Sequence, residues 1–124
     1  MANYRFFQTA DSRQDEIWNY TVENWGEMQA EKYITELHRH LEKLSDNKLL
    51  WRSLPGNLAV PDDLDIPVYF SHFQHHYIFF RELSDGCIGI MSILHDSMDI
   101  PVRLGEDLLR IEANYDKNNF NLFD

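Results

Sequence analysis

An almost unbroken apolar run at residues 87–94, CIGIMSIL, constrains the fold more than any other feature of this sequence. The pair Asp85-Gly86, which is typical of hairpin turns, precedes it, and the polar stretch HDSMDIP follows it. A short run without polar alternation indicates a strand that is covered on at least one face, and we expect cover on both. The run therefore predicts the central strand of a sheet.

Two aromatic and branched segments come before this run and extend the sheet. Residues 68–73, VYFSHF, and residues 76–83, HYIFFREL, both have the composition of strands, and Gln74-His75 between them fits a tight connection. Because alternate side chains of a strand point to opposite faces, Tyr77, Phe79 and Arg81 should share one face. An arginine is costly to bury unpaired, so we expect Arg81 to face an open side or a carboxylate.

The first half of the chain has a helical period. Residues 3–8, NYRFFQ, read as a short strand, after which Asp11 or Ser12 can cap a helix. The apolar and aromatic positions of that helix recur at helical spacing, Gly26 interrupts the pattern, and a second helix is predicted over about 27–45. The residues that form the first helix's stripe are Ile17, Trp18, Thr21 and Trp25.

A last helix is predicted over residues 103–116, so the order of elements is β-α-α-β-β-β-α. This order predicts an α+β domain in which an N-terminal strand joins a mostly antiparallel sheet and a helical hairpin packs on one face of it. The other face should stay partly open. We expect residues 1–124 to form a single domain, with residues 103–124 as a C-terminal helix and tail extension.

The composition limits the class of protein. The single cysteine, Cys87, cannot form an internal disulfide and fits a reducing compartment. No apolar run approaches the roughly 20 residues that a membrane span requires. We therefore expect a cytoplasmic protein that does not bind membranes, and no motif in the chain predicts a cofactor.

The chain carries a net charge of −10, and the charge is unevenly distributed. Residues 1–48 hold 6 Lys and Arg against 9 Asp and Glu, whereas residues 49–124 hold 5 against 12. Nucleic-acid binding depends largely on phosphate neutralisation by Lys and Arg, so direct nucleic-acid binding is not expected. An acidic surface suits a basic protein partner, although it can also serve solubility alone.

Three segments together resemble the ParE toxins of the RelE/ParE superfamily, which belong to bacterial toxin–antitoxin and plasmid stabilisation systems. Residues 10–44 contain Ile-Trp-x-Tyr and Trp-Gly-x-x-Gln-Ala elements like those of the family's first two helices. Residues 77–83, YIFFREL, resemble its central strand, and residues 88–104 resemble its final strand with a His-x-x-Met-Asp corner. The resemblance covers most of residues 4–104 and implies the same β-α-α-β-β-β layout.

The resemblance implies a toxin that binds and inhibits a protein target, DNA gyrase, and that a cognate antitoxin neutralises in a hetero-oligomer. The expected target-binding residues lie at the strand end and the corner, with an arginine from the neighbouring strand: Arg81, His95, Met98, Asp99 and Arg103. One alternative is a ribosome-dependent endoribonuclease of RelE type, in which Arg81 would be the cation and His95 the acid or base. Another is an inactive relative that only binds its antitoxin, which the aspartates of AVPDDLDIPV (59–68) keep open.

The antitoxin is expected on the open sheet face, if the aromatic side chains of the strands point outward there. The residues concerned are Tyr69, Phe73, Tyr77 and Phe79. The alternative is that the C-terminal helix covers that face itself. Histidines 72, 75, 76 and 95 gather on the predicted sheet, but no carboxylate or cysteine stands at a metal-ligand spacing beside them, and no metal site is predicted.

Overall fold

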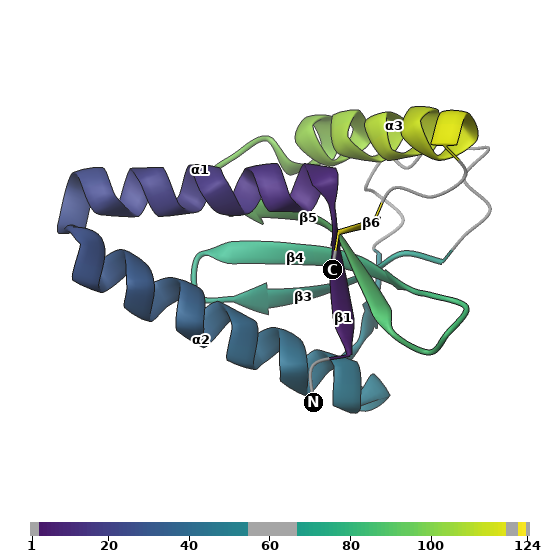
Figure 1. Ribbon diagram of the computed structural model, residues 1–124, viewed down its shortest axis with the longest axis horizontal. Coiled ribbons are helices and arrows are strands. Elements are labelled where there is room, and N and C mark those ends of the chain that lie inside the picture. The colour runs from purple at the N-terminus through teal and green to yellow at the C-terminus, as the bar shows by residue number, and fades with distance from the viewer. Residues whose placement is uncertain (1–2, 55–66, 119–121, 124) are drawn as a thin grey trace.

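The computed structural model of the chain describes residues 3–54, 67–118 and 122–123. It has the predicted α+β architecture, with helices on both sides of one sheet (Figure 1). The elements in order are β1 (Tyr4–Phe7), α1 (Gln8–Trp25), α2 (Glu27–Asp46), the 3-10 helix η1 (Lys48–Leu50), β2 (Arg52–Ser53), β3 (Tyr69–Phe73), β4 (His76–Glu82), β5 (Ile88–His95), α3 (Ile100–Asn118) and β6 (Leu122–Phe123).

The described strands form one sheet in the order β2-β3-β4-β5-β1-β6. β5 lies between β4, with which it pairs antiparallel, and β1, with which it pairs parallel. The other neighbouring strands are antiparallel. All side chains of β5 from Ile88 to Leu94 are buried, which confirms the prediction of a central strand covered on both faces.

A bulge in β5 ties the start of α1 to the sheet. Phe79 pairs with Ser92 and Phe80 pairs with Ile90, so Met91 is the extra residue of the pairing. The carbonyl of Met91 accepts a hydrogen bond of 2.6 Å from the buried hydroxyl of Thr9, two residues into α1. The bulge thereby fixes where the first helix leaves the sheet.

Two apolar clusters lie on the two faces of the sheet. On one face α2 packs Leu37, Leu41 and Leu44 against Ile78 and Phe80, together with Ile17 from α1. On the other face α3 packs its own apolar row against the sheet, and this cluster contains Phe79, Met91, Leu94, Leu104, Leu108 and Ile111. The expectation of a partly open face was therefore wrong, and the alternative, cover by the C-terminal helix, holds. The physical reason is the amphipathic row of α3, which is buried when it packs against the apolar face of the sheet.

The boundaries of two helices differ from those predicted. α1 starts at Gln8 directly after β1, and Phe7 occupies the N-cap position without a side-chain hydrogen bond, so the cap predicted at Asp11 or Ser12 is wrong. α3 starts at Ile100 rather than 103, with Pro101 in its first turn, where its missing N–H costs nothing. η1, β2 and β6 were not predicted, because two or three residues are too few to carry a period.

The two predicted turns are confirmed. Gln74 and His75 connect β3 to β4, and Gln74 has a positive φ of 52°. Gly86 has φ of 89°, which glycine adopts without strain, and its N–H donates to the carbonyl of Leu83 at 3.0 Å. The β3–β4 turn lies at the same end of the sheet as the surface described next, whereas the turn at Gly86 lies at the opposite end.

Candidate functional site

The corner after β5 (residues 95–99) is held by hydrogen bonds that its main-chain N–H groups donate. The N–H of Met98 donates to the carbonyl of His95 at 3.0 Å, and the N–H of Ser97 donates to Nδ1 of His95 at 3.0 Å. The N–H of Asp96 donates to the carbonyl of His75 at 2.8 Å, which links the corner to the β3–β4 turn. The corner is therefore a fixed surface feature rather than a free loop end.

Four of the predicted target-binding residues lie along this corner and the first turn of α3, and all are accessible. Met98 is 37% exposed and Asp99 is exposed. The side chain of His95 is partly exposed, and Arg103 is exposed and paired with Glu106 at 3.3 Å. The structure thus brings His95, Met98, Asp99 and Arg103 together on one part of the surface.

Arg81, the fifth predicted residue, lies elsewhere. It pairs with Gly89 near the start of β5, whereas His95 at the end of β5 pairs with His76. Six residues of extended strand, about 20 Å, therefore separate the two positions. Arg81 is 8% exposed, and its guanidinium lies 4.9 Å from the ring centre of Phe7. Arg81 therefore does not face an open side near the corner, because the covered face includes this end of β4, and the other alternative, a carboxylate partner, stays a prediction.

The side chain of Asp96 is surrounded by imidazoles. The rings of His72 and His75 each approach one carboxylate oxygen to 3.7 Å, and Nδ1 of His95 lies 3.5 Å from the other. His76 completes the group, with its ring 5.1 Å from that of His95. These four histidines come from the ends of three different strands, and their side chains lie close together around Asp96. Within the described part of the chain no such group of side chains is arranged to hold a metal ion.

His76 is the innermost of these histidines. Its Nδ1 is hydrogen-bonded to the hydroxyl of Tyr33 in α2. Burial, together with the nearby His95, lowers the pKa of His76 to about 4, against 6.5 for a free imidazole. Burial also raises the pKa of the Tyr33 hydroxyl above its ordinary value. The pair is therefore neutral at neutral pH and serves as an uncharged link between α2 and the strand ends.

Next to the corner lies a groove of about 540 Å³, which we call the hairpin groove. It is bounded by α1, the start of α2, the β3–β4 turn and the corner. Its lining is mainly apolar and includes Ile17, Tyr20, Trp25, Tyr33, Ile93 and Met98. His95 and Met98 belong to both the groove and the corner, so the two surfaces are continuous.

The aromatic residues predicted to bind an antitoxin do not share a face. Tyr69 and Phe73 pack with the α1–α2 cluster, whereas Tyr77 and Phe79 pack with the α3 cluster. Phe79 is only 1% exposed. The prediction required one open face that carries all four aromatic side chains, and this condition is not met. In the register of β3 and β4, Tyr69 is opposite Phe80 and Phe73 is opposite His76, so Tyr77 and Phe79 point to the other face.

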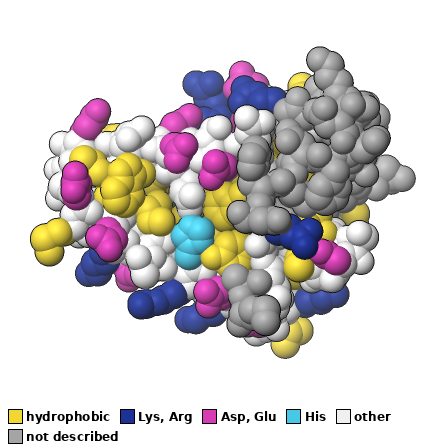
Figure 2. Space-filling view, viewed as in Figure 1, with side chains coloured by type: hydrophobic (Ala, Val, Ile, Leu, Met, Phe, Trp, Pro, Cys, Tyr) yellow, Lys and Arg dark blue, Asp and Glu magenta, His cyan; other side chains and the backbone are white. Residues whose placement is uncertain are grey.

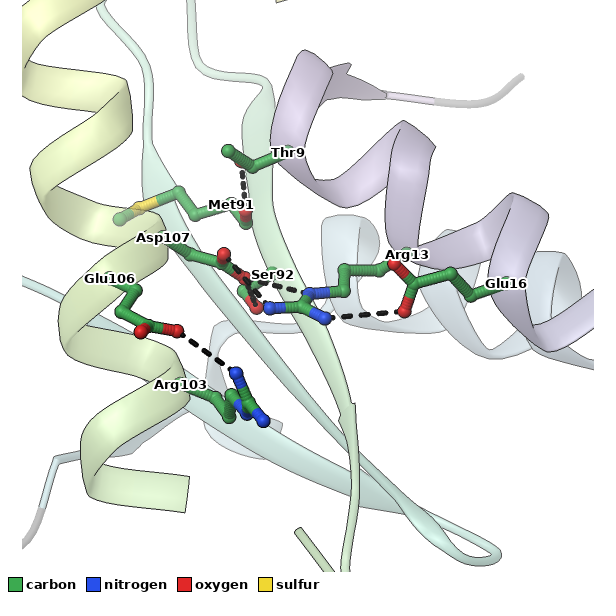
Figure 3. Close-up of polar contacts among 8 residues, drawn as sticks. All are labelled: Thr9, Arg13, Glu16, Met91, Ser92, Arg103, Glu106 and Asp107. Atoms are coloured by element: carbon green, nitrogen blue, oxygen red, sulfur yellow. Dashed lines mark hydrogen bonds and ion pairs between the residues drawn. The ribbon is translucent and has the colours of Figure 1, made fainter. Parts of the chain in front are cut away.

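A buried ion pair that the sequence reasoning missed attaches α3 to the rest of the chain (Figure 3). Asp107 is fully buried and accepts hydrogen bonds from Arg13 of α1, at 3.1 Å from both Nε and Nη2, and from Ser92 of β5 at 2.6 Å. Desolvation lowers the pKa of the Arg13 guanidinium, but the hydrogen bonds and charge interactions with Asp107 and Glu16 together outweigh it and raise the pKa. The burial of Asp107 could have been predicted from the sequence, since it lies on the same helical face as Leu104, Leu108 and Ile111.

The chain was also compared with known proteins. A family model described as the ParE toxin of type II toxin–antitoxin system, parDE, matches residues 4–100, which run from β1 to the first residue of α3. None of the helices within the described ranges combines the length and the apolar character that a membrane span requires.

Individual relatives carry the same name. Toxin ParE1 of Mycobacterium tuberculosis (strain H37Rv) is 26% identical over 99 residues, which cover 80% of this chain and 94% of that protein. Toxin ParE1 of Caulobacter vibrioides is 28% identical over 105 residues, which cover 85% of this chain and all of that protein. Toxin ParE of Escherichia coli is 26% identical over 105 residues, which cover 83% and 95%.

Proposed function

Because the chain belongs to the family of ParE toxins of type II toxin–antitoxin systems, we propose that it acts by binding and inhibiting a protein target and that a cognate antitoxin neutralises it. By the resemblance described above, the target is DNA gyrase. The family implies the antitoxin as the partner, and inhibition of a protein by binding needs a surface rather than catalytic groups.

The corner is the observation that carries this proposal. His95, Met98, Asp99 and Arg103 combine an apolar side chain with three polar or charged ones, all accessible and on a backbone held by hydrogen bonds. Little conformational freedom is lost when such a surface binds a partner. His95, Met98 and Asp99 lie within the family match, which ends at residue 100, whereas Arg103 lies beyond it.

An endoribonuclease activity has less support. It would need Arg81 and His95 to act on the same phosphate, and their separation of about 20 Å along β4 and β5 exceeds the reach of two side chains converging on one group. The burial of Arg81 further argues against it as the cation that meets RNA. The excess of acidic residues over Lys and Arg is unfavourable to RNA binding as well.

The test is induction of the chain alone in bacteria with pulse-labelling of DNA and protein synthesis. We expect DNA synthesis to fall first, and purified protein to inhibit the supercoiling reaction of gyrase. A Met98→Ala/Arg103→Ala variant should lose most of this inhibition, whereas Leu109→Ala, an exposed position on α3 outside the corner, should keep it. Earlier loss of protein synthesis would instead support a ribonuclease, and no effect on either would support an inactive relative.

A further inference from the structure

The corner contains a hydrogen bond that only a neutral histidine can make. Nδ1 of His95 accepts from the main-chain N–H of Ser97 at 3.0 Å, and the hydroxyl of Ser97 lies 2.7 Å from the same nitrogen. Because a main-chain N–H can only donate, Nδ1 carries no proton in this arrangement, and the neutral ring has its proton on Nε2. The turn over residues 95–97 therefore depends on the charge state of one side chain.

A carboxylate lies next to the same nitrogen. Oδ1 of Asp96 is 3.5 Å from Nδ1 of His95, and both side chains are partly exposed. A protonated Nδ1 can no longer accept from Ser97, but it can donate to this carboxylate in a charge-assisted hydrogen bond after a movement of about 0.7 Å. His95 therefore has two alternative partners, one for each charge state of its ring.

Two further imidazoles share that carboxylate. Nε2 of His72 and Nδ1 of His75 each lie 3.7 Å from Oδ2 of Asp96, and both rings are exposed. His76 stays neutral near neutral pH, because burial lowers its pKa to about 4. Free imidazoles take up protons between about pH 5 and pH 8. Acidification through that range can therefore place several positive charges around one carboxylate.

The other titratable and charged groups near His95 come from α1, α2, the corner and α3. They are Arg13, Glu16, Tyr33, Asp99, Arg103 and Glu106. Both guanidinium groups already have a carboxylate partner, and the Tyr33 hydroxyl is bonded to His76. Toward the hairpin end the surface is acidic, since residues 14–31 contain five Asp and Glu residues and no Lys or Arg. Figure 2 shows acidic side chains bordering hydrophobic ones there. Positive charge on the imidazoles is therefore added to a largely acidic surface.

We propose that the corner responds to pH: a proton taken up from solvent by His95 transfers Nδ1 from Ser97 to Asp96, releases the turn over residues 95–97 and weakens the binding of the protein target. This inference rests on the proposed function, since it adds a regulation to the corner proposed to bind the target. A released turn has to be ordered again when the target binds, and this cost lowers the affinity. One hydrogen bond of this kind changes a dissociation constant by about fivefold.

The first experiment follows the chain alone by NMR as the pH is lowered from about 7.5 to about 5.5. Nitrogen-15 spectra of the histidine rings should show the proton of His95 on Nε2 alone at the higher pH and on both nitrogens at the lower. Over the same range the amide of Ser97 should lose its protection from solvent exchange. The amide of Asp96 donates to the carbonyl of His75 and should keep its protection, so it serves as the internal control. A Ser97 amide that stays protected while His95 is protonated would contradict the proposal.

The second experiment measures the affinity of the chain for purified gyrase by biolayer interferometry at the same two pH values. The quantity compared is the rise in the dissociation constant between them. The test variant is His95→Asn, because the oxygen of an asparagine side chain can accept the N–H two residues on but cannot be protonated in this range. We expect the rise in the wild-type chain to be about fivefold larger than in the variant. The matched control, His40→Gln, removes a histidine of α2 that bonds to Ser71 outside the cluster and should keep the wild-type rise. Far-UV circular dichroism at both pH values checks that each chain is folded.

The outcomes separate this inference from the proposed function. If the chain binds gyrase at neither pH, the proposed function fails and the effect on the target fails with it, whereas the Ser97 amide still decides whether the corner responds to the proton. If the wild-type chain binds gyrase and shows the same rise as His95→Asn, the proposed function stands and only the inference is overturned. A larger rise in the wild-type chain and in His40→Gln than in His95→Asn supports both.

Discussion

Asp107 is the residue on which the attachment of α3 depends most. A buried carboxylate is tolerated only when it is paired and hydrogen-bonded, and here Arg13 and Ser92 supply both requirements. The pair spans three elements, since it joins α1, β5 and α3. By contrast, the pair between Arg103 and Glu106 lies on the surface within one helix (Figure 3). The two pairs resemble each other in distance but not in solvation.

Replacing Asp107 with Asn should therefore destabilise the fold strongly. The substitution keeps the shape but leaves the largely buried Arg13 facing a neutral amide, and the expected loss in the free energy of unfolding is about 3 kcal/mol. Arg103→Gln should change it by less than about 0.5 kcal/mol, because solvent screens an exposed pair. Urea unfolding of both variants measures this difference, and equal losses would refute the role given to Asp107.

His76 gives the fold a dependence on pH. Its pKa of about 4 lies below the 6.5 of a free imidazole, so between these values the unfolded chain binds a proton that the folded chain does not. The free energy of unfolding should therefore fall as the pH drops from about 6.5 to about 4. Burial also lowers the pKa of His38 and His40, which contribute in the same direction.

The expected contribution of His76 is on the order of 1–3 kcal/mol, since one pKa unit corresponds to about 1.4 kcal/mol and the ring is only partly buried. Unfolding curves at pH 7 and pH 4.5 for the wild-type chain and for His76→Gln measure it. The variant should lose less stability on acidification. A His76 ring that titrates near pH 6.5 by NMR would contradict the burial argument.

At the scale of elements, α3 is an amphipathic helix with a sharply divided surface. Leu108 is 1% exposed and its neighbour Leu109 is 55% exposed. The helix begins where the family match ends, so most of it lies beyond the region that defines the family. It nevertheless supplies part of the core, because it covers the face of β4 and β5 that the hairpin leaves uncovered.

These adjacent leucines allow a matched test of that role. Leu108→Ala should lower the free energy of unfolding by about 2–5 kcal/mol, since it leaves a cavity against the sheet. Leu109→Ala should lower it by less than about 0.5 kcal/mol, because its side chain is already in water. Both substitutions are neutral to slightly favourable for helix formation, so the difference reports packing alone. If Leu108→Ala proved as mild as Leu109→Ala, α3 would not contribute to the core.

At the scale of the whole molecule, one sheet separates two apolar clusters. Ile78 and Phe80 belong to one cluster and Phe79 to the other, although they are consecutive residues of β4. Because both clusters depend on the same strands, and because Asp107 links α3 to α1 and β5, loss of one cluster should remove the support of the other.

We therefore expect the chain to unfold in a single cooperative transition. Trp18, Trp25 and Trp51 all lie in or beside the α1–α2–η1 side of the molecule, so their fluorescence reports that side. In Leu108→Ala, whose change lies on the α3 side, the urea midpoint from tryptophan fluorescence should move as far as the midpoint from circular dichroism. Separate midpoints would mean that the two faces unfold independently.

Some of this protein follows from the sequence alone. Three elements could be predicted because each depends on residues that are close in the sequence. They are β5, from its continuous apolar run, the turn at Gly86, from the conformation that glycine allows, and α2, from its helical apolar stripe. The order of elements and the ParE family were likewise readable from the residues, and so was the grouping of His95, Met98 and Asp99, which are neighbours in the chain.

The tertiary structure decided what depends on partners distant in sequence. Arg81 was expected near His95, but the two lie toward opposite ends of the β4–β5 pair, because strand register and not residue type sets their separation. The tertiary structure closed the second face with α3 and paired Asp107 with Arg13, 94 residues away. It also left Tyr20 and Trp25 exposed, although they lie on a helix with a regular apolar stripe. A period shows which face of a helix is apolar, but only the length of the sheet beneath it decides how much of that face is covered.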